Sequence, residues 1–292
     1  MPSASGDGRR EGRKILFFET MKNHKAKKSL GQNFLKSEAI LKKIVEAGEV
    51  KDTDLVLEIG PGKGALTEKL LGARCKVLAV EKDDDLYEML KEKFKKEISD
   101  GRLNLIHDDI LNLEASAYGL EPSAYKIIAN IPYNITGAIL KKFLAGEYQP
   151  KLMVLMVQHE VAQRIMGRTG PSSAKASAGK KENLLSISVK AYGEPKLVVK
   201  VDKRYFSPEP AVNSAIIKIS GIGRKMFVEN KVNEGIFWQI VKAGFAHKRK
   251  KLSGNLKSLC QGSTLTSLGD KRAEDLTLTD WISLARGLKP SA

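Results

Sequence analysis

Short apolar runs recur along the first half of the chain, separated by segments whose apolar residues return every three or four positions. The short runs predict buried strands, and the longer periodic segments predict amphipathic helices. Strands that alternate with helices of this length indicate a parallel, doubly wound α/β sheet. The predicted strands cover residues 55–59, 76–80, 103–107, 126–129 and 152–157, and the predicted helices cover 38–47, 65–71 and 136–144, with one more capped by Asp83.

The pattern changes towards the C-terminus. Two further strands are predicted at residues 185–191 and 215–219, and the Gly-, Ser- and Lys-rich stretch at 167–183 is expected to be a mobile loop. Gly221-Ile222-Gly223 predicts a hinge, and the apolar positions beyond it follow a helical period. We therefore expect three parts: a disordered basic arm over residues 1–28, an α/β domain over 29–220 and a small all-helical domain over 221–292.

Charge and cysteine content narrow the classes of function. The 292 residues include 50 Lys and Arg against 34 Asp and Glu, a formal charge of +16. This excess favours a polyanionic partner, and charge alone does not decide between nucleic acid and an anionic membrane surface. Cys75 and Cys260 are too few for a disulfide framework or a metal cluster, which fits a reducing, cytoplasmic setting. No apolar run approaches the roughly 20 residues of a membrane span.

A glycine or polar residue follows each predicted strand in turn. Gly60 and Gly62 form a turn that lets a ligand approach the backbone closely. Glu81 is placed for two ribose hydroxyls, and Asp109 can accept a hydrogen bond from an adenine amino group. Alone, these residues also fit a tight turn, a solvated carboxylate and a helix cap. Together they predict a nucleotide site at the carboxyl end of the sheet, for a dinucleotide or for S-adenosylmethionine.

The fourth predicted strand runs into Asn130-Ile131-Pro132-Tyr133. The Asn130 side-chain oxygen and the Pro132 carbonyl can both accept hydrogen bonds from an exocyclic amine. The Tyr133 ring offers a surface on which a base can stack, worth roughly 1–3 kcal/mol. Taken alone, the tetrapeptide fits an ordinary strand-to-helix turn with a core tyrosine about as well.

Four segments in this order resemble the ribosomal RNA adenine N6-dimethyltransferases. They are SLGQNFL at 29–35, EIGPG at 58–62, NIPY at 130–133 and FSPEPAVNSA at 206–215, and the resemblance runs from about residue 26 to the C-terminus. The segment FAHKRKKLSGNL at 245–256 is similar to a basic helix of the small-subunit enzymes. The large-subunit methyltransferases of macrolide resistance share the first four segments and lack this helix.

The resemblance implies a Rossmann-like methyltransferase sheet and S-adenosylmethionine as the methyl donor. Asn130 and Pro132 would hold the adenine amino group, with its lone pair towards the methyl group, without a strong general base. Basic side chains would contact RNA phosphates, including lysines of the arm. The implied cofactor contacts, to which Gly62 of the glycine turn is added, are Asn33, Leu35, Gly60, Glu81, Asp109 and Asn130. The implied contacts to the target base are Asn130, Pro132, Tyr133 and Phe206. The candidate RNA contacts are Lys248, Arg249, Lys250 and Lys251.

The resulting hypothesis is an enzyme that dimethylates two adjacent adenosines in the 3′-terminal hairpin loop of small-subunit ribosomal RNA. It would act as a monomer on a pre-ribosomal small subunit, without a membrane or a metal, and take part in ribosome biogenesis. The loop at 167–183 and the arm before residue 29 depart from the family pattern. Three rivals remain: a large-subunit methyltransferase, a non-enzymatic assembly or transcription factor of the same fold, and an NAD-dependent oxidoreductase.

Overall fold

A seven-stranded sheet forms the centre of the computed structural model, which describes residues 25–167, 181–259, 265 and 268–287. Most of the predicted arm and residues 168–180 of the predicted loop lie outside the described residues. The strand order is β4-β3-β2-β5-β6-β9-β7. The strands are β2 (Leu55–Ile59), β3 (Lys76–Glu81), β4 (Leu103–His107), β5 (Tyr125–Asn130), β6 (Leu152–Gln158), β7 (Glu194–Val201) and β9 (Ser214–Ser220).

The pairing confirms the doubly wound sheet predicted from the sequence and adds an antiparallel edge. β2, β3, β4, β5 and β6 are parallel, so their carboxyl ends meet at one edge. β9 and β7 extend the sheet in antiparallel pairing. A second, two-stranded sheet joins β1 (Phe34–Leu35) to β8 (Phe206–Ser207). It attaches the N-terminal segment to the loop that precedes β9.

One predicted strand was wrong. Residues 185–191 are expected to be extended, but the chain forms helix α8 (Leu184–Lys190) there. The Asn183 side chain accepts hydrogen bonds from the amides of Leu185 and Ser186. The Ser186 hydroxyl accepts a hydrogen bond from the Asn183 amide, and these reciprocal bonds make a capping box. The strand lies further on, as β7. Its Glu-Pro start argues against a central strand, but a proline is tolerated at an edge position such as this one.

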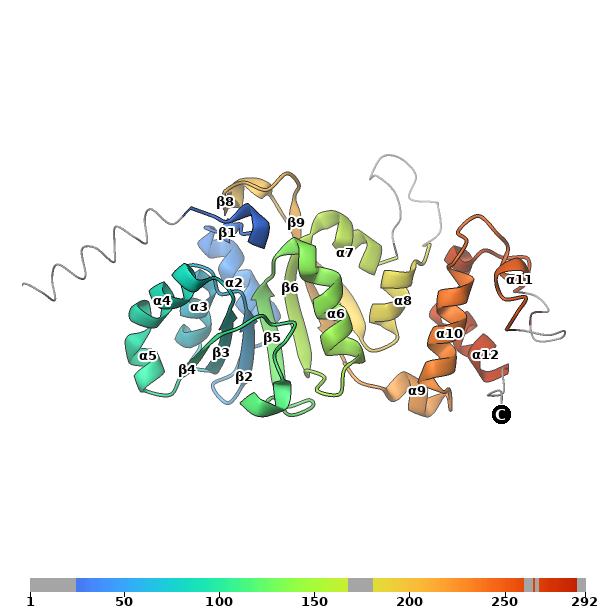
Figure 1. Cartoon of the computed structure of the whole chain (residues 1–292), viewed down its shortest axis with the longest axis horizontal. Helices are drawn as coiled ribbons and strands as arrows, with labels where there is room; N and C mark the ends of the chain where they lie inside the picture. The colour runs from blue at the N-terminus through green and yellow to red at the C-terminus, as the bar shows by residue number, and fades with distance from the viewer. Residues whose placement is uncertain (1–24, 168–180, 260–264, 266–267, 288–292) are drawn as a thin grey trace, which may run out of the picture.

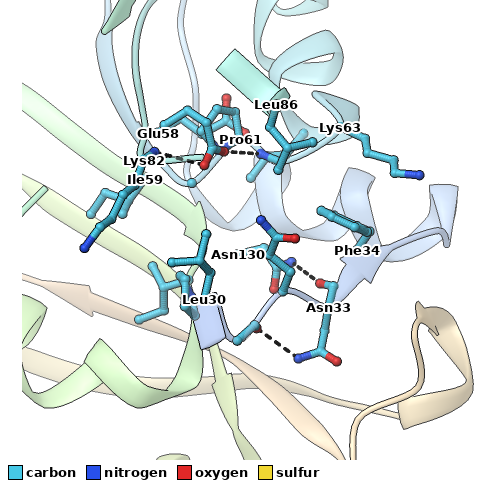
Figure 2. A pocket seen from close by; sticks show the side chains of 18 of the residues that line it. Leu30, Asn33, Phe34, Glu58, Ile59, Pro61, Lys63, Lys82, Leu86 and Asn130 are labelled. Atoms are coloured by element: carbon cyan, nitrogen blue, oxygen red, sulfur yellow. Dashed lines mark hydrogen bonds between the residues drawn. The ribbon is translucent and has the colours of Figure 1, made fainter. Parts of the chain in front are cut away.

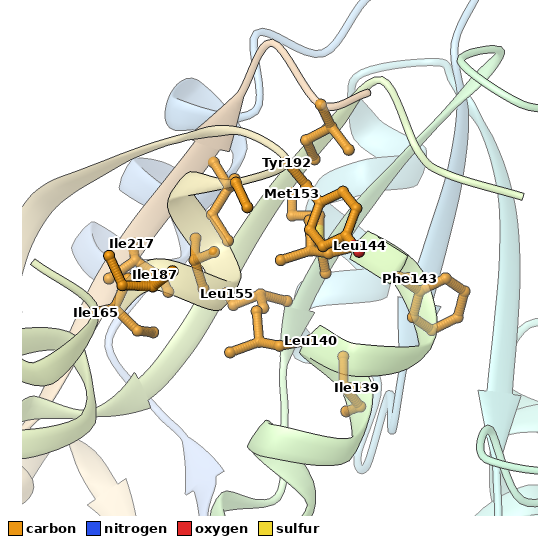
Figure 3. Close-up of a cluster of buried hydrophobic side chains, with 14 of the residues drawn as sticks. Ile139, Leu140, Phe143, Leu144, Met153, Leu155, Ile165, Ile187, Tyr192 and Ile217 are labelled. Atoms are coloured by element: carbon orange, nitrogen blue, oxygen red, sulfur yellow. The ribbon is translucent and has the colours of Figure 1, made fainter. Parts of the chain in front are cut away.

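Helices cover both faces of the sheet. α2 (Glu38–Ala47) and α3 (Ala65–Gly72) pack on one face through residues such as Ile44 and Leu70, and α4 (Asp84–Lys93) adds Leu90. α6 (Thr136–Ala145), α7 (His159–Ile165) and α8 pack on the other, where Phe143, Ile165 and Ile187 meet the strands (Figure 3). Apolar side chains are buried on both faces of the sheet, so the sheet is held rigidly between two apolar layers.

The C-terminal part is helical, as predicted. α9 (Lys225–Glu229), α10 (Glu234–Gly244), α11 (Leu252–Asn255) and α12 (Leu278–Gly287) lie at the end of the molecule opposite α4 and α5 (Lys95–Ser99) (Figure 1). The buried Trp281 of α12 packs against Gly244, where an added Cβ would lie 2.4 Å from its ring. The apolar cluster of these helices is continuous with that of the sheet, and the division near residue 221 stays a prediction.

The basic segment before α11 departs from the predicted helix. α10 ends at Gly244, and α11 begins only at Leu252, so Lys248, Arg249, Lys250 and Lys251 form an exposed turn between them. Among the residues that the structure describes, none of the helices is long and apolar enough to cross a bilayer.

Candidate active site at the carboxyl ends of the strands

A cavity of about 430 Å³ opens where β2, β3, β4 and β5 end. The segment at 29–36 forms its opposite wall (Figure 2). This volume lies in the range of small-molecule sites. The residues predicted to contact a nucleotide, which come from segments far apart in the sequence, line this one space: Asn33, Leu35, Gly60, Gly62, Glu81, Asp109, Asn130, Pro132 and Tyr133.

The glycine turn has a left-handed backbone at both of its predicted glycines. Gly60 has φ 63° and Gly62 has φ 60°, values that side chains rarely adopt. A Cβ at Gly62 would also lie 3.1 Å from two carbons of the Phe34 ring. The Gly62 amide donates to Glu81 at 3.0 Å, which closes the turn onto the next strand. The Phe34 ring therefore takes the space that a side chain at position 62 would need, and the Gly62 amide is used by Glu81.

Glu81 is held by backbone amides. Its carboxylate is 5% exposed and accepts hydrogen bonds from the amides of Gly62, Lys82 and Asp83, at 2.9–3.0 Å. Burial raises the pKa of Glu81, although the amide hydrogen bonds oppose the shift. Three of about four acceptor positions are thus in use. For Glu81 to accept hydrogen bonds from two ribose hydroxyls, a hydroxyl and one of these amides would have to share an acceptor position on the carboxylate.

Asp109 lies in the cavity wall with two partners already in place. One oxygen accepts the Leu111 amide at 2.9 Å, as in a local cap, and the other accepts Lys82 Nζ at 2.8 Å. Burial would raise the pKa of this carboxyl, but the Lys82 and Leu111 hydrogen bonds outweigh it and the pKa is lowered. The carboxylate is charged, and a ligand amino group would have to share it with Lys82.

The Asn130 amide has a fixed orientation. Its Nδ2 donates to the Asn33 carbonyl at 3.2 Å, while Asn33 itself is braced by a bond from its own Nδ2 to the Gly31 carbonyl (Figure 2). No donor among the described residues bonds its Oδ1, so this oxygen is the acceptor that remains. The Pro132 carbonyl, expected to be free, accepts the Ile135 amide at 3.3 Å. Its second lone pair can still accept a hydrogen bond.

The two aromatic residues predicted to hold a base lie in different surroundings. Tyr133 is half-buried, lines the cavity and joins its hydroxyl to Ser214 Oγ at 2.5 Å. It also lines an adjoining hollow of about 340 Å³, together with Lys28, Gly31, Asn33, Asn134 and Gln158. Phe206 is only 2% exposed and packs in the core beside Leu35. It does not line the cavity, and its contact with a base stays a prediction that requires the ring to leave the core.

Two features of the site were not predicted as site residues. Glu58 lines the cavity, is 1% exposed, and its Oε2 has no hydrogen-bond partner among the described residues. Burial, opposed by the neighbouring Thr67 hydroxyl and reinforced by the Glu81 carboxylate, raises the pKa of Glu58 to about 8. A charged residue inside the otherwise apolar run LVLEI was the available signal.

The second feature is a clasp, formed by Asp83, Lys27 and Gln32. Asp83 was predicted only as a helix cap and does accept the Asp85 and Leu86 amides. The same buried carboxylate also accepts Lys27 Nζ at 2.9 Å and Gln32 Nε2 at 2.7 Å. These bonds hold the N-terminal segment against the cavity. No local pattern indicates such contacts, because the partners are distant in the sequence.

The four basic residues proposed for RNA are exposed and do not line the cavity. Lys251 forms an ion pair with Asp270 at 2.8 Å. The structure therefore places these residues on the helical part, separate from the nucleotide site.

Comparison with known proteins points in one direction. A model of the ribosomal RNA adenine dimethylase family matches residues 23–288. The ribosomal RNA small subunit methyltransferase A of Dehalococcoides mccartyi (strain CBDB1) is 42% identical over 272 residues, covering 89% of this chain and 87% of that protein. Its counterpart in Acaryochloris marina is 35% identical, covering 91% and 98%.

Solved structures agree on the fold. A dimethyladenosine transferase from Plasmodium falciparum superposes with a TM-score of 0.68 at 26% identity, covering 86% of this chain and 95% of that one. A 23S ribosomal RNA methyltransferase, ErmE, superposes with a TM-score of 0.67 at 23% identity, covering 88% and 99%, which shows a shared fold.

Proposed function

The chain belongs to the ribosomal RNA adenine dimethylase family, and we propose that it dimethylates N6 of two adjacent adenosines in the 3′-terminal hairpin loop of small-subunit ribosomal RNA. The observation that carries the chemistry is the Asn130 amide. Its nitrogen is anchored on the Asn33 carbonyl, which leaves an acceptor oxygen at the cavity, at the end of a strand. An acceptor in this place suits an amine as nucleophile.

S-adenosylmethionine is the cofactor, and it supplies an electrophilic methyl group when bound. The residues present fit it. The left-handed turn leaves room for close approach at Gly60, and the buried Glu81 carboxylate suits ribose hydroxyls. The Asn130 oxygen, which no described residue bonds, is an acceptor at the cavity that the protein itself does not use. Asn33, Leu35, Asp109 and Asn130 would complete the contacts.

The protein's own part in the reaction is positioning. Asn130 Oδ1 and the Pro132 carbonyl would accept the two hydrogens of the adenine amino group, and so favour a pyramidal nitrogen whose lone pair faces the methyl group. The Tyr133 ring would support the base, taken from a loop where unstacking costs little. Once the nitrogen has become cationic, its proton can leave to water. Orientation of this kind supplies several kcal/mol without a strong base.

The substrate is ribosomal RNA, and the small subunit is favoured over the large one. Relatives named for the small subunit reach 42% identity, whereas the 23S methyltransferase is 23% identical and supports only the fold. We further propose that a monomer acts on a pre-ribosomal small subunit in the cytoplasm, as a step of its biogenesis. The exposed turn formed by Lys248, Arg249, Lys250 and Lys251 would contact phosphates there.

The test is to incubate the protein with methyl-labelled S-adenosylmethionine and immature small subunits, mature small subunits or large subunits, and to map the modified bases. We expect two adjacent N6-dimethyladenosines in the 3′-terminal hairpin of immature small subunits. Label in the large subunit, or label confined to other bases, would contradict the proposal. Naked small-subunit RNA as a fourth substrate tests whether assembled protein is needed.

A further inference from the structure

The hydroxyl of Tyr133 is attached to a rigid part of the sheet. Its partner, Ser214, is the first residue of β9 and is fully buried. The Ser214 backbone is paired with Gln158 of β6 on one side and with Val201 of β7 on the other. Tyr133 instead begins a short 3₁₀ turn outside the sheet (Tyr133–Ile135). The 2.5 Å bond between the two hydroxyls therefore connects a turn to a fixed point.

A bond at the tip of a tyrosine fixes the direction in which the ring points. The phenol oxygen lies on the axis that runs from Cβ through the ring, so holding it restricts the first side-chain torsion and therefore the position of the ring. Burial raises the pKa of Tyr133 while the Ser214 hydrogen bond opposes the shift, so the phenol stays neutral at ordinary pH. No other described residue bonds the Tyr133 hydroxyl.

We propose that Ser214 is a positioning residue for methyl transfer: through the Tyr133 hydroxyl it fixes the position of the ring on which the target adenine rests. This rests on the proposed function. Asn130 ends β5 and Tyr133 begins the turn three positions later, so the position of the ring determines how the amino group of a stacked base meets Asn130 Oδ1. Loss of the bond would let the ring swing about its first torsion. The rate of transfer would then fall, while the cofactor contacts would be unaffected.

Strand β5, which ends at Asn130, supplies a matched control. Tyr125 begins β5 at the opposite end of the sheet and donates its hydroxyl to the Tyr148 carbonyl at 2.6 Å. It is buried and bonded, and it does not line the cavity. Tyr125→Phe removes a comparable bond without touching the site. Ser188→Ala, which removes a hydroxyl bonded to the Leu185 carbonyl in α8, is the control for a lost serine.

The experiment compares Ser214→Ala, Tyr133→Phe and the double variant in single-turnover methylation of small subunits, with cofactor Kd and melting temperature measured in parallel. Each single variant should lower the rate about 5- to 10-fold, the range that one lost hydrogen bond provides. The double variant should be no slower than either single one, because both remove the same bond. Cofactor Kd should stay within about 2-fold of wild type, since the bond does not reach the cofactor contacts.

Several outcomes would overturn the inference. These are a Ser214→Ala rate equal to wild type, multiplicative effects in the double variant, or rate losses as large in Tyr125→Phe and Ser188→Ala. A wild-type protein that leaves small-subunit adenosines unmodified would instead overturn the proposed function. Because Tyr133→Phe removes the bond from the other partner, a folding defect in Ser214→Ala would not prevent the test.

Discussion

The two ends of the parallel sheet use similar polar side chains in opposite ways. At the amino end, Lys126 is buried and its Nζ bonds both Asp54 and the Glu49 carbonyl at 2.7 Å. Tyr125, beside it, is bonded as well. At the carboxyl end, Glu58 and Asn130 each present an oxygen that no described residue bonds. The amino end satisfies its buried groups internally, whereas the carboxyl end leaves the Asn130 oxygen as an acceptor for a ligand.

The difference assigns stability and chemistry to separate ends of the same strands. β5 carries Lys126 near its start and Asn130 at its last residue. An unpartnered buried group costs about 1–3 kcal/mol, so such groups are affordable only where the rest of the fold is well paired. A variant at one end should therefore change folding and not turnover, and a variant at the other should do the reverse.

Asn130→Ala should give the largest effect and tests the open end. It removes the acceptor that would hold the amino group, so kcat should fall about 10²–10³-fold, as when one transition-state hydrogen bond is lost. Melting temperature should barely change, and cofactor Kd should rise far less than kcat falls. Steady-state methylation and calorimetric titration measure the two effects. Asn104→Ala, an exposed asparagine of β4, is the control; normal turnover with weakened cofactor binding in Asn130→Ala would refute the role.

Lys126→Met tests the closed end. It leaves Asp54 without its cation, and removing one partner of a buried pair destabilises a fold by about 3 kcal/mol. Chemical denaturation should show that loss, while kcat per folded molecule stays near wild type. Lys76→Met, an exposed lysine at the start of β3, should change neither quantity. A Lys126→Met variant that folds normally but turns over slowly would show that the two ends are not separate.

Glu58 offers a test by pH in the protein without cofactor. The pKa of this carboxyl is raised from 4.5 to about 8, so the folded state binds a proton that the unfolded state releases. Stability is then largest below the unfolded pKa and falls as pH rises towards the folded one, by about 2 kcal/mol between roughly pH 5.5 and 7. Glu58→Gln should remove this part of the slope in urea unfolding, and Glu121→Gln, an exposed site, should not. Equal slopes in both variants would contradict the assignment.

The clasp should give the smallest effect. Lys27 contacts Asp83 at 2.9 Å and Asp85 at 2.8 Å, but its side chain is 39% exposed, so the ion pairs are weak. Lys27→Met should raise the rate of cofactor dissociation about 2- to 5-fold in stopped-flow measurements. At high salt the variant and the wild-type protein should release the cofactor at the same rate, because salt screens the ion pairs. Lys42→Met, on the outer face of α2, is the control. If dissociation is unchanged at low salt, the N-terminal segment is held by other contacts.

Local patterns were enough for most of the fold. The parallel strands and the helices α2, α3 and α6 were predicted within a residue or two, because short apolar runs and helical periods are strong signals, whereas α7 was not predicted. The strand prediction for residues 185–191 was wrong because the alternating Leu, Ser, Ile, Ser and Val have the pattern of a strand. The cap at Asn183 and burial against the sheet favour a helix instead. β7 was not predicted; its proline argues against a central strand and is tolerated because β7 lies at the edge of the sheet.

The candidate site was predicted as a set of residues but not as a set of contacts. Four strand ends could be grouped, because parallel strands share an edge. The Lys82 bond to Asp109, the Ser214 bond to Tyr133 and the clasp join residues far apart in the chain, and no spacing rule indicates them. Phe206 shows the same limit, since its motif does not reveal that the ring is buried in this structure.

The small ladder between β1 and β8 has a practical consequence for assigning roles. Leu35, which lines the cavity, is the register partner of Phe206, on the loop proposed to meet the base. Because the two strands are paired, a displacement of one strand also displaces the other. The proposed contacts to the cofactor and to the RNA base are therefore coupled. A variant in the Phe206 loop that slows methylation should therefore have its cofactor affinity measured before the loss is ascribed to the RNA.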